Sequence, residues 1–200
     1  MTFSAAFAIY IKFFFILTPF FILAVFLALT EKVEPRLQRM LAARVTLGIV
    51  LITVILFLFG AEIFALLGIT IDSFRAGAGA LLFLSAVSLT EGRFSLPATD
   101  RSLMDLAIVP LAIPITIGPG SVGALIIIAA ETADWMLKLE TLGAILLACL
   151  TIGAMLLAAP RVKKIIGSNG ISMLSKVTGL VLAALSCQMM IEGVRNQWGA

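Results

Sequence analysis

An interrupted apolar stretch between residues 105 and 130 is the strongest constraint on how this chain can fold. The interruption consists of Pro110, Pro114, Gly118, Pro119 and Gly120. Proline removes a backbone N–H and clashes with the preceding helical turn, and glycine adopts backbone conformations that are closed to other residues. We therefore predict that a helix begins near residue 105, is broken inside this stretch, and resumes toward residue 130.

The composition places this broken helix in a membrane. Of the 200 residues, 62% are hydrophobic and 12% are charged, whereas about 25% are charged in soluble domains. The mean hydropathy is +1.18. At about 20 residues a span, the length accommodates six spans and no separate soluble domain. We predict one all-α, polytopic membrane domain over residues 1–200.

The six apolar segments are separated by short polar ones. We predict a charged loop at 31–39, a dividing loop at 92–101, a polar link at 131–140 and a turn at 167–170. The third span is short, lying between Arg75 and Glu91. Trp135 and Trp198 suit the membrane interface. The other spans are predicted at 3–29, 41–59, 105–130, 142–159 and 177–191.

A second break is predicted at Thr18-Pro19, in the middle of the first span. Within a membrane, a break persists only where protein or a watery cavity surrounds the freed backbone groups. The alternative is a simple kink. Lys12, about 10 Å before Pro19 along a helix, either extends to the interface or joins an internal charge pair.

The two halves of the chain repeat each other. Pro19 precedes Glu31 by the interval that separates Pro119 from Glu131, and the third and sixth spans match at an offset of 101. Because each half has three spans, which is an odd number, the second half enters the membrane from the opposite face, and the repeat is therefore inverted. We predict repeats at 1–92 and 102–200, with spans 1 and 4 broken at mid-membrane. The offset of 101 pairs Arg75 with Lys176, Ser85 with Ser186, and Glu91-Gly92 with Glu192-Gly193, and we expect Arg75 and Lys176 each to cap a short helix near an interface.

Basic residues are distributed unevenly between the two sides of the membrane. Ten lie in or beside the first, third and fifth loops, and four, which are Lys12, Arg75, Lys138 and Arg195, lie on the other side. The positive-inside rule then places the odd-numbered loops in the cytoplasm and both termini outside.

Several classes of function are disfavoured by composition. Histidine is absent and only Cys149 and Cys187 are present, so the usual zinc ligand sets and histidine-assisted nucleophiles are missing. We expect no metal, no cofactor and no enzymatic activity. A net charge of +3 gives no reason to expect nucleic acid as a partner.

Several short motifs are distributed along the chain: Val109-Pro-Leu-Ala-Ile-Pro114, Gly118-Pro119-Gly120, Leu67-Gly-Ile69, Phe74-Arg-Ala-Gly77, and Lys176-Val-Thr-Gly179 with Gln188. In these motifs the chain resembles the MarC family of bacterial and archaeal inner-membrane proteins. The resemblance implies six spans and a carrier for small neutral amino acids such as alanine or glycine. The family usually has Asp or Asn where this chain has Thr18.

We therefore expect a secondary transporter in the bacterial or archaeal inner membrane. The solute carboxylate would bind backbone N–H groups after the glycine-proline break, where a helix N-terminus favours an anion. Carbonyl groups freed by the prolines would face the ammonium group. The expected substrate-binding residues are Thr18, Pro19, Thr116, Gly118, Pro119, Gly120 and Ser121.

Ion coupling would have to use backbone carbonyls, Lys12, Glu62 or Asp72. The alternative function is a structural or regulatory membrane protein that carries no solute, in which the prolines are kinks and the small residues serve packing. Expected partners are the lipid bilayer and a small neutral amino acid, and a homo-oligomer is compatible with either function.

Overall fold

The computed structural model describes residues 3–30, 33–66, 68–92, 116–132 and 134–198, and these residues form helices and short connections only. The all-α prediction is confirmed for this part of the chain. The helices are α1 (Phe3–Ile16), α2 (Pro19–Leu29), α3 (Pro35–Leu66), α4 (Ile71–Glu91), α5 (Pro119–Glu131), α6 (Trp135–Leu157) and α7 (Ala159–Trp198).

Four of these helices, α3, α4, α6 and α7, are long and apolar enough to cross a membrane. The bent pair α1 and α2 provides a fifth candidate span, and α5 is a shorter apolar helix. The first part of the predicted fourth span, with Pro110 and Pro114, lies outside the described residues.

Two predicted loops are shorter than expected, because the helices that follow them begin earlier. α3 begins at Pro35 rather than near residue 41, and proline suits a first helical position because its φ is already helical. α6 begins at Trp135 rather than near residue 142. Its N-cap is Asp134, whose carboxylate accepts the N–H of Leu137 at 2.9 Å. Both helices thus extend past their apolar runs into polar segments.

The predicted turn at 167–170 is reduced to a single residue. Within α7 only Gly167 departs from helical geometry, with φ 73° and ψ 165°, a left-handed φ that glycine adopts at little cost. The helix resumes directly and continues to Trp198, so the last span extends at both ends beyond the predicted 177–191.

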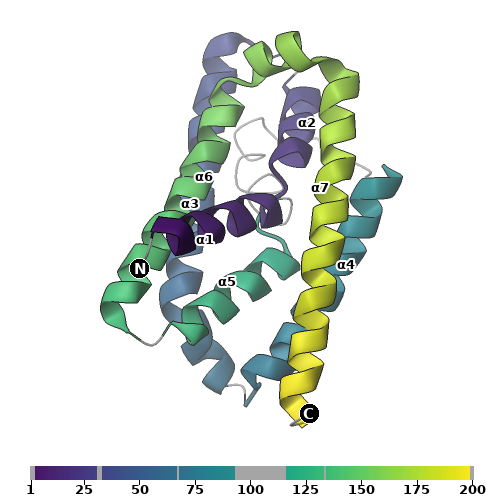
Figure 1. Ribbon diagram of the computed structural model, residues 1–200. Helices are drawn as coiled ribbons and strands as arrows, with labels where there is room; N and C mark the ends of the chain where they lie inside the picture. Colours follow the sequence, from purple (N-terminus) through teal and green to yellow (C-terminus); the bar gives the residue numbers. More distant parts are fainter. Residues whose placement is uncertain (1–2, 31–32, 67, 93–115, 133, 199–200) are drawn as a thin grey trace.

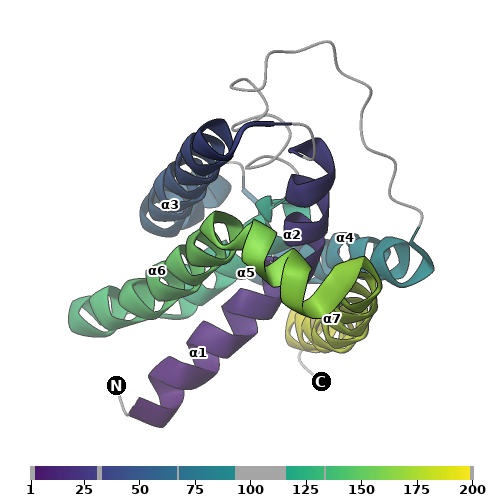
Figure 2. The same cartoon turned by 90° about the horizontal axis from the view of Figure 1, so that it is seen from above.

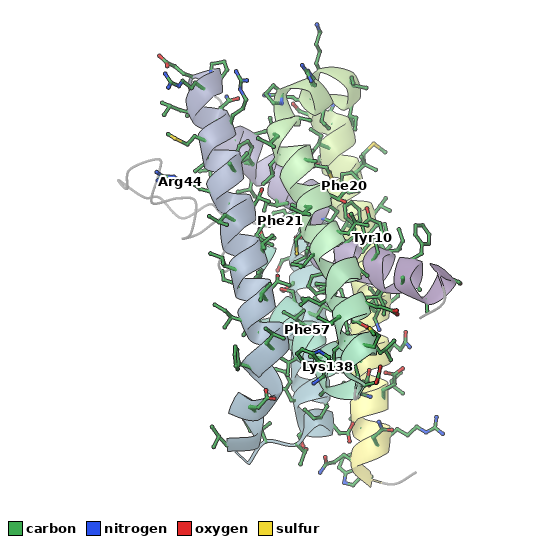
Figure 3. All side chains as sticks on the ribbon, turned by 90° about the vertical axis from the view of Figure 1, so that its left-hand side faces the viewer. Tyr10, Phe20, Phe21, Arg44, Phe57 and Lys138 are labelled. Carbon is green, nitrogen blue, oxygen red and sulfur yellow. The ribbon has the colours of Figure 1, made fainter. Side chains whose placement is uncertain are left out.

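The helices form two pairs with shorter helices between them. Figure 1 shows α4 beside α7 on one side and α3 beside α6 on the other, and Figure 2 shows α2 and α5 between these pairs. α1 crosses the bundle at mid-height against α6, where the hydroxyl groups of Tyr10 and Thr151 lie 3.2 Å apart (Figure 3). The α4–α7 contact is close, because a Cβ at Gly79 would lie 2.9 Å from the Ser186 carbonyl oxygen. The absence of a side chain at Gly79 thus lets α4 approach α7 closely.

Candidate functional site

The predicted break in the first span is confirmed. α1 ends at Ile16, α2 begins at Pro19, and the two axes differ by 41°. Between them Thr18 has φ 52° and ψ 58°, and it is the only non-glycine residue with positive φ in the described part of the chain. A left-handed threonine costs on the order of 1–3 kcal/mol. Such a conformation persists only where the surrounding packing imposes it, and Thr18 is buried.

The break frees backbone acceptors at the C-terminal end of α1. The Leu17 N–H donates to Phe13 and the Thr18 N–H to Phe15, and the next donors, from residues 21 and 22, both bond the Thr18 carbonyl. Within the described residues, the carbonyl groups of Ile16 and Leu17 thus accept no backbone bond across the break. The negative end of a helix dipole therefore lies at a buried position.

The N-terminal end of α5 has the opposite polarity. Gly118 is its N-cap and has no side chain that could cap the helix, and Pro119 is its first residue. The N–H groups of Gly120 and Ser121 belong to the first turn and have no acceptor within the helix. The Ser121 hydroxyl does not cap them, because it donates to the Gly118 carbonyl at 2.9 Å. Both residues are buried.

These two helix ends meet at one cavity of about 290 Å³. Thr18 and Ile16 line it from the first break, and Thr116, Gly118, Gly120 and Ser121 line it from the second. The Thr18 Oγ1 atom is buried and has no hydrogen-bond partner among the described residues. A buried hydroxyl without a partner is costly, so this atom marks a position where a polar ligand group would stabilise the protein.

A third wall of the cavity comes from α4, which contributes none of the predicted substrate-binding residues. Leu82 packs against the backbone of Gly120, where an added Cβ would lie 2.7 Å from the Leu82 Cβ. Ser85 and Ser88 also line the cavity, and their hydroxyls each donate to a carbonyl of their own helix at 3.0 Å. The wall from α4 is therefore mainly apolar.

The structure thus brings together residues that are about a hundred positions apart in the sequence. Of the predicted substrate-binding residues, Thr18, Thr116, Gly118, Gly120 and Ser121 line the cavity. Pro19 is buried directly beside Thr18, and Pro119 begins α5.

The residues considered for ion coupling do not join this cavity. Lys12 and Glu62 are exposed on α1 and α3, and neither Lys12, Glu62 nor Asp72 is among the described residues that line it. Asp72 instead lies 4.0 Å from Arg75 and accepts the Asn196 side-chain amide at 3.2 Å.

Arg75 differs from the prediction of a helix cap at the interface. It is 7% exposed and forms an ion pair with Glu131, the last residue of α5. The Glu192 carboxylate of α7 lies 3.9 Å away. We call Arg75, Asp72, Glu131 and Glu192 the Arg75 cluster. The sequence contained a signal for it, because Glu131 and Glu192 are both among the residues that match between the two halves of the chain at a constant interval.

The MarC family model, for integral membrane proteins, matches residues 3–198. The chain belongs to the MarC family. This MarC-family protein is 34% identical over 188 residues to a UPF0056 membrane protein of Methanocaldococcus jannaschii, covering 90% of this chain and 91% of the relative. A UPF0056 membrane protein of Aquifex aeolicus is 25% identical over 188 residues, covering 90% and 88%. One from Pyrococcus horikoshii is 26% identical over 198 residues, covering 96% and 94%. No solved structure matches the MarC-family chain.

Proposed function

We propose that this MarC-family protein is a secondary transporter of small neutral amino acids, with the cavity between the two helix breaks as its substrate site. The observation that carries this proposal is the meeting of two helix ends of opposite polarity at one cavity. Broken helices at mid-membrane form the substrate sites of many secondary transporters.

The polarity of the site matches a zwitterion. The carboxylate would accept the N–H groups of Gly120 and Ser121, where the α5 dipole favours an anion. The ammonium group would donate to the carbonyls of Ile16 and Leu17 at the end of α1. The Thr18 hydroxyl, which has no hydrogen-bond partner in the described part of the chain, would donate to or accept from the solute.

The cavity also limits the size of the side chain. Its volume of about 290 Å³ lies at the lower limit of ligand pockets, which hold about 300–1,000 Å³. Ile16, Phe21 and Leu82 supply apolar walls. Glycine and alanine fit this space and polarity better than large or charged amino acids. The proposal includes no catalysed reaction.

Alternating access would follow from an inverted repeat of residues 1–92 and 102–200, giving six spans in the inner membrane with both termini outside. The contacts between helices support this part of the proposal. α2 packs on α7 and its repeat counterpart α5 packs on α4, while α4 and α7 pack on each other. An exchange of partners of this kind is expected from two halves related by a twofold axis.

Counterflow in reconstituted vesicles tests the transport function without knowledge of a coupling ion. Vesicles loaded with unlabelled alanine should accumulate labelled alanine and glycine only when they contain the protein, and excess leucine or succinate should compete poorly. Absence of counterflow for every neutral amino acid, with protein that is folded by circular dichroism, would refute the transporter and favour the structural or regulatory alternative.

A further inference from the structure

A second cavity of about 250 Å³ adjoins the candidate substrate site. The two cavities share Phe21, Ser88 and Leu89 as lining residues, so they lie next to each other along α2 and α4. From α7, the second cavity is lined by Ser168, Ser172, Ser175 and Lys176. We call it the vestibule.

The vestibule extends to one end of the helix bundle. Gly92, at the end of α4, lines it and is exposed, as are Ser168, Ser172 and Lys176. No ion pair of Lys176 occurs among the described residues. An ammonium group and serine hydroxyls at the mouth of a cavity are suited to a carboxylate.

The opposite end of the bundle is closed in this structure. α5 lies so close to α4 that a Cβ at Gly123 would be 2.1 Å from the Ala78 Cβ. Beyond this contact, Arg75 joins the end of α5 to the end of α7 through Glu131 and Glu192. The Arg75 cluster therefore connects α4, α5 and α7 at this end of the bundle.

The open and the closed end occupy equivalent positions in the repeat. Lys176 follows Arg75 by 101 residues, and Glu192 follows Glu91 by the same interval. At one end the cation is buried among carboxylates, and at the other end it lines a cavity. In an inverted repeat, such a difference between equivalent positions distinguishes the open side from the closed side.

We infer that the vestibule is the route by which the solute reaches or leaves the substrate site at the Lys176 end, and that the Arg75 cluster is the closed gate at the other end. Lys176 would attract the carboxylate of the passing solute. Opening the gate requires α5 to separate from α4, which breaks the Arg75–Glu131 ion pair. The inference rests on the proposed transport function, but its structural part can be tested separately.

Labelling of single cysteines from each side of the membrane provides this test. In a Cys149→Ala/Cys187→Ser background, Ser172→Cys reports on the vestibule. Met189→Cys reports on the closed side, because Met189 is 5% exposed and belongs to a buried cluster that also contains Ala78 of α4 and Ile127 of α5. A membrane-impermeant thiol reagent is applied to vesicles of each orientation. Ser172→Cys should react from the Lys176 side alone, and Met189→Cys should react from neither side.

Removing the ion pair should then expose the closed side. Glu131→Gln should raise the labelling rate of Met189→Cys from the Arg75 side about tenfold, since loss of a contact made only in the closed state shifts the equilibrium. Glu140→Gln removes an exposed carboxylate of α6 and is the matched control, for which no change is expected.

The outcomes separate the gate from the transport function. Labelling of Ser172→Cys from the Arg75 side, or no effect of Glu131→Gln on Met189→Cys, would overturn the inference even if alanine counterflow is observed. Side-specific labelling with the expected Glu131→Gln effect would support the gate even if counterflow fails, in which case the assigned substrate would be wrong.

Discussion

Arg75 of α4 forms an ion pair with Glu131, the last residue of α5, and so links two helices whose sequences are separated by the dividing loop. The same α5 has its uncapped N-terminus at the candidate substrate site. Because α5 is only 13 residues long, a ligand at one end and an ion pair at the other can both influence its position.

Arg75→Gln should destabilise the protein more than Lys176→Gln does. Arg75 is buried beside three carboxylates, whereas Lys176 is exposed. Loss of a partner from a buried ion pair costs about 3–5 kcal/mol, and the half-exposed carboxylates here reduce the expected cost to about 1–3 kcal/mol. Thermal unfolding in detergent measures the difference. Equal melting temperatures for the two variants would contradict the structural role of the cluster.

Thr18→Val should have opposite effects on stability and on solute binding. Valine keeps the shape but removes a buried hydroxyl without a partner, so the ligand-free protein should be as stable as the wild type or more stable. Alanine binding should weaken by about 1–3 kcal/mol if that hydroxyl bonds the solute. Thr18→Ser, which keeps the hydroxyl, is the control. Unchanged affinity in Thr18→Val would exclude Thr18 from the site.

Gly120→Ala should impair transport without preventing membrane insertion, and Gly120→Leu should abolish it. A Cβ at Gly120 would lie 2.7 Å from the Leu82 side chain and 2.9 Å from the Leu82 Cα, so α5 must move away from α4. Overpacking of this kind costs about 1–3 kcal/mol. Gly143→Ala is the matched control, because nothing lies within 4 Å of that position. Normal alanine flux in a folded Gly120→Leu variant would show that the break at Gly118-Pro119 is only a kink and does not form a substrate site.

Reporter fusions test the orientation independently of transport. Fusions after Gln38 and Ser168 should report the cytoplasm, because most basic residues lie on the side of the membrane that carries these two positions. Fusions after Ile69 and Trp198 should report the outside. The reverse pattern would place the vestibule on the outer face and would invert the assignment of the closed gate.

Local chemistry explains what the sequence alone determined. The break at Thr18-Pro19 follows from the missing N–H and the steric clash of one proline, and the start of the second half-helix at Gly118-Pro119 has the same origin. The all-helical membrane fold follows from composition. The family follows from short motifs that retain their order along the chain. None of these conclusions requires knowledge of which helices touch.

Helix ends were less predictable, since hydropathy defines the apolar part of a span and not the helix. α3 and α6 continue into polar segments where Pro35 and Asp134 favour a helical start. Gly167 bends α7 but does not end it, because one left-handed residue can be followed directly by another helical turn.

Only the tertiary structure decided which residues of distant segments meet. Thr18 and Gly120 line one cavity because α2 and α5 pack between the α3–α6 and α4–α7 pairs. Arg75 is buried because α5 and α7 bring Glu131 and Glu192 to it, whereas Lys176, which the sequence predicts to be its counterpart, borders an open cavity. Two positions predicted to be equivalent thus have different environments, because burial and ion pairing depend on how helices pack in space and not on the order of residues along the chain.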